Sequence, residues 1–298
     1  MKRTSKKKVK DDWDDEEYED LEAEEELEDP GTGKKKKKKK KFGVISIILI
    51  VVCVIILVIA AYKILSVYVD YHESTEAVNS VKADAFATDD DDDYDAFDFD
   101  ALLAQNSEAL GWIRMKGDAV ENGDVDILID YPIVQTTDNE YYLERGIDGS
   151  YSAYGTLFVD YRCPDGLESS NAVIWGHNMT YPDDAMFGYI NKYEDEEGFV
   201  EKYPYYDVWI GSEHYIYKVF AYGVVDVDGF FFQYSFVDDD AFMDWLGDCF
   251  DNLTIYDAEL SDFDADSKII TMCACLYPSD DQYRFAVLMY RLDDDEEE

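Results

Sequence analysis

The sequence predicts a mainly β fold, a closed or nearly closed barrel of about eight strands with peripheral helices, preceded by one transmembrane helix. From about residue 99 to about 292, short β-rich runs alternate with Gly, Pro, Asn and Asp, the residues that turns require. A run of 21 residues, 42–62, carries no charge. We find no internal repeat. About eight strands in one unit of about 190 residues favour a barrel with helices on its rim.

The uncharged run 42–62 predicts the transmembrane helix. At 1.5 Å per residue it spans about 30 Å, the thickness of a bilayer core. A buried helix of a globular core rarely runs this long without a polar face. The apolar region of a cleaved signal peptide is about 7–15 residues long and starts near the N-terminus, whereas 41 residues precede this run.

Charge predicts the orientation of this helix. Eight lysines, residues 34–41, come directly before the span, and only Lys63 comes directly after it. The positive-inside rule therefore places the N-terminus in the cytoplasm and residues 63–298 outside the cell membrane. The whole chain carries 26 Lys and Arg against 69 Asp and Glu, a net charge of −43. Nucleic acid is excluded as a partner, because such a chain repels phosphate.

The composition divides the chain into five parts. Residues 1–41 form a charged cytoplasmic tail that we expect to be disordered, and residues 42–62 form the span. Residues 63–98 form a stalk and an acidic linker, with a helix expected to about residue 80 and the linker over about 84–98. Residues 99–292 form the globular domain, and 293–298 form an acidic tail. The acidic runs lack the spacing and glycine of a calcium loop, and we expect no metal or cofactor.

Patterning within the domain predicts the individual elements. Helices are expected at 99–112, at 185–193, and at 237–252, where Phe242, Trp245, Leu246, Cys249 and Phe250 recur at spacings of three and four. Strands are expected at 126–129, 133–135, 156–159, 172–175, 206–210, 214–227, 268–275 and 285–292.

The chain contains three histidines, and one of them is a candidate for catalysis. His72 lies in the stalk, and His214 lies in a strand-like run. His177 follows the apolar run 172–175 and a glycine, so a strand presents it to a loop.

Five cysteines are too few for a disulfide scaffold in a chain of 298 residues. Cys53 lies in the span, and Cys249 lies on the apolar face of a predicted helix. Cys163 lies in a loop, and a disulfide between Cys163 and Cys249 stays open as an alternative. A disulfide between Cys273 and Cys275 would be strained, since residues two apart in a strand point in parallel about 6.5–7 Å from each other.

Cys275 and Arg284 form the remaining candidate pair. If the strands 268–275 and 285–292 pair antiparallel, Cys275 and Arg284 share one rim of the barrel. A guanidinium beside a thiol favours the thiolate and can donate hydrogen bonds to an oxyanion. A plain surface charge is the alternative for Arg284.

The chain resembles the class B sortases, a family of cysteine transpeptidases, from about residue 106 to residue 292. The blocks that carry the resemblance are NSEALGWIRMKG (106–117), YPIVQTTDNEYYLERGIDGSYSAYGTLFVDYR (131–162), SSNAVIWGHNMTYPDDAMFGYINKY (169–193) and TMCAC with YRFAVLMYRL (271–292). The resemblance implies Cys275 as nucleophile, with His177 and Arg284. Met272 and Ala274 depart from the family motif, which usually has Leu and Thr there, and Cys273 stays a rival nucleophile.

The resemblance also implies the reaction and its partners. Cys275 would attack a threonine carbonyl in the C-terminal sorting motif of a secreted protein, and His177 would protonate the departing amine. Arg284 would stabilise the oxyanion, and an amine of a cell-wall peptide or of a pilin would resolve the thioacyl enzyme, with hydrolysis as a side reaction. Two alternatives stay open: a membrane-anchored cysteine peptidase and a non-catalytic surface binding module.

Overall fold

The computed structural model describes residues 43–86, 96–119, 125–179, 185–275 and 282–292. The chain divides into two compact units, residues 1–57 and 58–298. Helix α1 (Val44–Ala85) begins in the first unit, where its large apolar side chains are exposed. Among the described residues, α1 is the one helix long and apolar enough to cross a membrane. The expected tails at 1–41 and 293–298 and most of the acidic linker lie outside the described residues.

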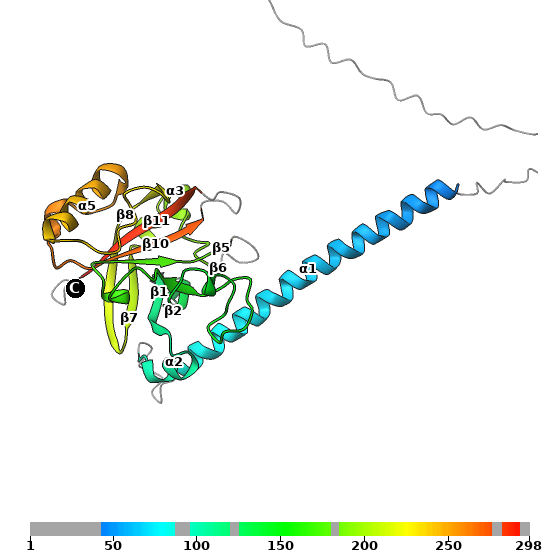
Figure 1. The fold of residues 1–298 in the computed structure, drawn as a ribbon, viewed down its shortest axis with the longest axis horizontal. Coiled ribbons are helices and arrows are strands. Elements are labelled where there is room, and N and C mark those ends of the chain that lie inside the picture. The colour runs from blue at the N-terminus through cyan, green and yellow to red at the C-terminus, as the bar shows by residue number, and fades with distance from the viewer. Residues whose placement is uncertain (1–42, 87–95, 120–124, 180–184, 276–281, 293–298) are drawn as a thin grey trace, which may run out of the picture. The chain divides into compact units, whose positions relative to one another are not determined.

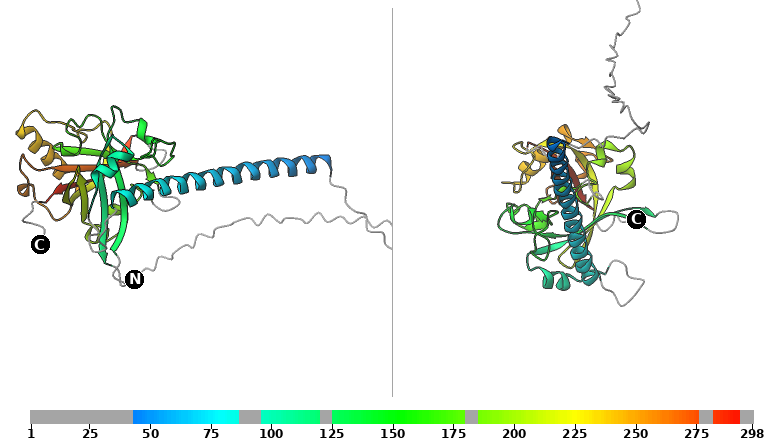
Figure 2. Two further views of the ribbon diagram at one scale, coloured as in Figure 1. Left: turned by 90° about the horizontal axis from the view of Figure 1, so that it is seen from below. Right: turned by 90° about the vertical axis from the view of Figure 1, so that its right-hand side faces the viewer.

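The second unit contains a closed eight-stranded β-barrel, as the sequence predicts. The ring runs β11-β10-β4-β3-β2-β1-β7-β8, and β8 pairs with β11 to close it (Figures 1 and 2). The short strand β9 extends the sheet beside β8, and β5 pairs with β6 in a separate hairpin. The strands are β1 (Ala109–Ala119), β2 (Val125–Val134), β3 (Leu157–Val159), β4 (Asn171–Trp175), β5 (Asn178–Met179), β6 (Ala185–Met186), β7 (Tyr205–Ile210), β8 (Glu213–Asp226), β9 (Thr254–Ile255), β10 (Ile269–Cys275) and β11 (Tyr283–Arg291).

Two pairs in the ring are parallel, β2 with β3 and β4 with β10. Parallel neighbours need long crossover connections, and the chain uses these to carry its short helices. The helical elements after α1 are α2 (Phe99–Gln105), η1 (Tyr141–Leu143), η2 (Gly166–Glu168), α3 (Lys192–Asp195), α4 (Phe199–Lys202), α5 (Asp239–Asn252) and η3 (Leu260–Asp262). Helix α5 begins where Asp238 accepts a hydrogen bond from the Ala241 N–H at 2.9 Å.

Apolar side chains gather in two clusters. The larger one fills the barrel and extends under α5, whose buried face consists of Phe242, Trp245, Leu246 and Cys249. The smaller one lies between the end of α1, helix α2 and strands β1 and β7, with Val81, Leu102, Trp112 and Trp209 buried in it. The C-terminal part of α1 is therefore part of the core of the second unit.

Four expected elements differ in the structure. The expected helix 99–112 ends at Gln105, and residues from Ala109 form β1 instead. The reason is Gly111, where a Cβ would lie 1.8 Å from the Trp209 carbonyl oxygen, so that β1 and β7 can approach closely. The two strands expected at 126–129 and 133–135 are one strand, β2. The expected helix 185–193 is wrong: β6 and turns occupy it, and α3 begins only at Lys192.

Candidate active site

Cys275 and Arg284 lie opposite each other on neighbouring strands. The strands β10 and β11 pair antiparallel, as expected, and their register joins Cys275 to Arg284 and Cys273 to Ala286. Cys275 is the last residue of β10. For Cys275 the structure gives the position of the backbone in the strand. The register brings its backbone to the same end of the barrel as the backbone of Arg284.

His177 reaches the same end of the barrel from the other side of β10. The parallel pairing of β4 with β10 joins Trp175 to Cys273, and the Gly176 N–H donates to the Cys273 carbonyl at 3.1 Å. Two residues further along both strands stand His177 and Cys275. Neighbouring strands lie about 4.8 Å apart. His177, Cys275 and Arg284 therefore follow one another across the ends of β4, β10 and β11.

The ring of His177 is oriented by a backbone carbonyl. Its Nε2 donates a hydrogen bond to the Leu143 carbonyl oxygen at 2.7 Å, and the side chain is half-buried. A carbonyl can only accept, so Nε2 carries a hydrogen and Nδ1 is the atom left to gain or lose a proton. An imidazole in this state can act as an acid or a base through Nδ1.

The turn that supplies this carbonyl is itself held in place. Asp138 accepts hydrogen bonds from the N–H groups of Tyr141 and Glu140, each at 2.8 Å, and these bonds lower the pKa of its carboxyl. Gly155 passes close beneath the turn with a φ of +62°, and a Cβ there would lie 2.4 Å from the Tyr142 carbonyl oxygen. Glycine is required at this position for both reasons.

Arg284 is half-buried, and its Nη1 donates to the Tyr283 carbonyl at 2.9 Å. Its charge acts on the neighbouring strand. Burial raises the pKa of the Cys273 thiol well above its ordinary value, and the guanidinium of Arg284 acts in the opposite direction. Cys273 is fully buried, so neither substrate access nor thiolate formation favours it as the nucleophile.

The remaining cysteines and histidines lie elsewhere. Cys163 and Cys249 are both buried free thiols, so the structure does not contain the disulfide left open between them. His214 lies on β8, stacks on Trp209 and donates to Asp207 at 2.9 Å. His72 lies on α1. Among the described residues, no group of three or more His, Cys, Asp or Glu could hold a metal ion.

Sequence reasoning missed one buried charge beside β4, Asp160, whose backbone N–H donates to the Val173 carbonyl at 2.8 Å. It directly follows β3 and is fully buried. Asp160 directly follows the apolar run 157–159, much as His177 follows the apolar run 172–175. This position after a predicted strand is a signal that could have identified Asp160.

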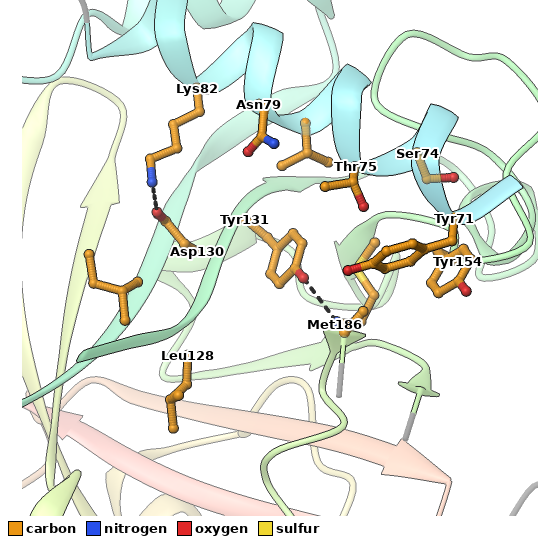
Figure 3. A pocket seen from close by; sticks show the side chains of 13 residues that line it. Tyr71, Ser74, Thr75, Asn79, Lys82, Leu128, Asp130, Tyr131, Tyr154 and Met186 are labelled. Atoms are coloured by element: carbon orange, nitrogen blue, oxygen red, sulfur yellow. Dashed lines mark hydrogen bonds and ion pairs between the residues drawn. The ribbon is translucent and has the colours of Figure 1, made fainter. Parts of the chain in front are cut away.

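A cavity of about 230 Å³ lies between the C-terminal part of α1, strand β2 and the β5–β6 hairpin (Figure 3). Tyr131 accepts a hydrogen bond from the Met186 N–H at 3.2 Å, and Lys82 forms an ion pair with Asp130. The hairpin begins one residue after His177. These contacts make the end of α1 a wall of the domain that carries the candidate site.

Comparison with known proteins identifies the fold and the class. No family model matches the chain. The crystal structure of sortase B from Bacillus anthracis superimposes with a TM-score of 0.60 at 25% identity, over 76% of this chain and 99% of that one. In sequence, sortase B of Listeria monocytogenes is 30% identical over 145 residues, 49% of this chain and 54% of that protein. Sortase B of Staphylococcus aureus is 26% identical over 105 residues, 35% of this chain and 38% of that protein.

The barrel is thus a sortase fold. Within the sortases, the similarity in sequence and in structure is to class B. The aligned part spans about half the length, or less, of the curated relatives it matches.

Proposed function

We propose that the chain is a cysteine transpeptidase of the class B sortase type. The observation that supports it most is the shared position of His177, Cys275 and Arg284 across the ends of three neighbouring strands. A thiol, an imidazole and a guanidinium can together carry out acyl transfer through a thioester, as nucleophile, proton donor and oxyanion stabiliser. The similarity to sortase B proteins supports the same reaction.

In this proposal Cys275 is the nucleophile. Its thiol gives its proton to Nδ1 of His177, the thiolate adds to the carbonyl of a threonine in a C-terminal sorting motif, and a tetrahedral oxyanion forms. The guanidinium of Arg284 donates hydrogen bonds to that oxyanion. When the C–N bond breaks, His177 gives a proton to the departing amine from Nδ1, while Leu143 keeps Nε2 engaged. A thioacyl enzyme remains.

The second half of the reaction uses an amine. The amine attacks the thioester carbonyl, a new amide forms, and the sulfur leaves as the thiolate. His177, now deprotonated at Nδ1, accepts the proton that the attacking amine loses. A cell-wall peptide or a pilin lysine is the acceptor we propose, and secreted proteins are the donors. Water in place of the amine gives hydrolysis.

We also propose that the apolar part of α1 anchors the enzyme in the cell membrane as a single span. The eight lysines before the span support a cytoplasmic N-terminus and an extracellular barrel. Protease added to intact cells is then expected to digest epitopes within 99–292 and to spare an epitope within 1–41. Protection of both would contradict the proposed orientation.

The test of the reaction uses the full chain in detergent with a peptide library that carries a fixed threonine at the scissile position. Cys275→Ala is expected to abolish the thioester adduct seen by intact mass and to lower turnover by about a thousandfold or more. Cys273→Ala is the matched control, two residues away on the same strand, and is expected to keep the adduct. Unchanged turnover in Cys275→Ala would end the assignment.

Product analysis separates transpeptidation from peptidase activity. With a primary amine present, the wild-type chain is expected to give a new amide between the peptide and the amine. Exclusive hydrolysis at every amine concentration would favour a cysteine peptidase. Absence of any adduct would favour a non-catalytic module.

A further inference from the structure

Asp160 is a fully buried carboxylate that follows strand β3. It receives hydrogen bonds from Arg162 Nε and Nη2 at 2.9 and 2.8 Å, from Trp175 Nε1 at 2.9 Å and from Asn139 Nδ2 at 2.7 Å. The Arg162 backbone N–H also donates to it, at 2.9 Å. A buried charge with this many donors is compensated, so the group can remain ionised in the interior.

The balance of these interactions keeps Asp160 ionised. Burial alone would raise the pKa of the carboxyl, but the hydrogen bonds from Arg162 and Trp175 outweigh burial and hold the pKa below its ordinary value. The negative charge of Asp160 also contributes to the raised pKa of the Cys273 thiol. Asp160 therefore lies within electrostatic range of the strand that ends in Cys275.

Two of the residues that donate to Asp160, Trp175 and Asn139, lie next to the two segments that position His177, the end of β4 and the turn at η1. Trp175 is the last residue of β4, two positions before His177, so its indole fixes the strand end that carries the histidine. Asn139 precedes η1, whose last residue Leu143 accepts the hydrogen bond from His177 Nε2. Asn139 is held a second time, because its Oδ1 accepts from the Tyr161 N–H at 3.0 Å.

The third donor reaches the segment between β8 and α5. The guanidinium of Arg162 lies 4.0 Å from the ring centre of Tyr234. The ring of Phe232 packs against Trp175 with 5.1 Å between centres, and Asn171 Nδ2 donates to the Gln233 carbonyl at 2.8 Å. Asp160 thus lies where this segment, the end of β4 and the turn that orients His177 come together.

We propose that Asp160 is a positioning residue of the transpeptidation reaction: its carboxylate holds Trp175 and Asn139, and through them sets the place and the ring orientation of His177. The inference rests on the proposed function. The hydrogen bonds described for Asp160 do not include His177, so the carboxylate acts on geometry and takes no proton from the imidazole.

Asp160→Asn tests the proposal because it keeps the shape and removes the charge and part of the accepting capacity. In the full chain, kcat for amide formation is expected to fall by about ten- to a hundredfold, the range for a displaced catalytic group. KM is expected to change by less than about threefold, since the substrate contacts stay. Trp175→Phe, which removes the indole donor together with part of the ring that packs against Phe232, is expected to change kcat in the same direction.

Asp207→Asn is the matched control. Asp207 is also a buried carboxylate, 2% exposed, and also pairs with a basic side chain, His214, but it lies on β7. Its kcat is expected to stay near that of the wild type. Equal losses of kcat in Asp160→Asn and Asp207→Asn, or wild-type kcat in both Asp160→Asn and Trp175→Phe, would overturn the positioning role.

A readout independent of activity separates this inference from the proposed function. The hydrogen on His177 Nε2, bonded to a carbonyl at 2.7 Å, is expected to exchange slowly in nuclear magnetic resonance spectra of isotope-labelled histidine. Its exchange is expected to accelerate at least about tenfold in Asp160→Asn and to stay unchanged in Asp207→Asn. If the wild-type chain makes no amide, the proposed function fails, while this exchange still decides whether Asp160 orients His177.

Discussion

The second unit contains three buried thiols besides Cys275, those of Cys163, Cys249 and Cys273, and burial makes each of them unreactive. Burial raises the pKa of Cys163 to about 12 and also raises those of Cys249 and Cys273. Cys163 is further engaged, because its sulfur accepts a hydrogen bond from the Val173 N–H at 3.5 Å. Since the thiolate is the reactive form, these three positions serve packing.

The raised pKa values predict a loss of stability at alkaline pH. An unfolded thiol loses its proton near pH 8.5, while folded Cys163 keeps its proton up to about pH 12. Between these values the unfolded state binds fewer protons, so the free energy of unfolding falls as pH rises, by about 1.4 kcal/mol per pH unit for this thiol. Below pH 8.5 the contribution of Cys163 is fully present.

Urea unfolding between about pH 8 and about pH 10.5 measures this slope. Cys163→Ala is expected to make the slope shallower. Cys53→Ala, a change in the exposed apolar part of α1, is the control and is expected to leave the slope as in the wild type. Identical slopes in the wild type and Cys163→Ala would show that the folded thiol titrates normally.

Among the elements, the end of α1 has a structural role in the domain beyond that of a stalk. Val81 and Ala85 are buried against the smaller apolar cluster, and Ser74 Oγ lies 2.8 Å from Ser152 Oγ. Tyr71 packs on Tyr154 with 5.6 Å between ring centres. Both contacts reach the chain between η1 and β3, which begins directly after Leu143, the residue whose carbonyl accepts the hydrogen bond from His177. Docking of α1 therefore supports the segment that directly follows the turn orienting His177.

Two substitutions in the last turn of α1 test this docking. Ala85 is fully buried and Ala83 is exposed on the same helix. Ala85→Leu is expected to lower the free energy of unfolding by about 1–3 kcal/mol, because it overfills a packed site. Ala83→Leu is expected to change it by less than about 0.5 kcal/mol. Thermal and urea denaturation of the full chain measure both, and similar effects would mean that α1 does not dock.

Sequence predicted the strands that carry the site better than the segments between them. Lone apolar runs such as 172–175 and 268–275 can only be strands in this context, and they correspond to β4 and β10 within one residue at each end. The helix expected at 99–112 failed because Leu110 continues a helical spacing by chance, while the close approach at Gly111 is a tertiary feature. Asp160 escaped for a related reason: its role depends on Asn139 and Trp175, which are distant in sequence.

At the scale of the whole molecule, the dominant physical property is negative charge. The net charge is −43, and the first 41 residues contribute nothing to it because their acidic and basic groups cancel. The second unit has few basic side chains, and some of them form ion pairs within it, such as Arg162 with Asp160 and Arg291 with Glu168. The excess of carboxylates repels itself, and this repulsion opposes the compact state.

Salt is therefore expected to stabilise the protein. Raising sodium chloride from about 0.02 M to about 0.3 M shortens the screening length from about 20 Å to about 6 Å. The midpoint of thermal unfolding is expected to rise by about 2–4 °C for each kcal/mol of repulsion that is removed. Differential scanning calorimetry across this range measures it, and a falling midpoint would show that attractive pairs outweigh the repulsion.

The burial of Cys163, Cys249 and Cys273 has a practical consequence for chemical labelling. A small soluble electrophile meets three sulfurs that are covered by side chains and hold their protons, so these contribute little background. Once the exposed Cys53 is replaced, a covalent probe of peptidyl type would count the molecules in which the proposed nucleophile Cys275 reacts. The same selectivity would let a library of weak electrophiles be screened on a chain that lacks only Cys53.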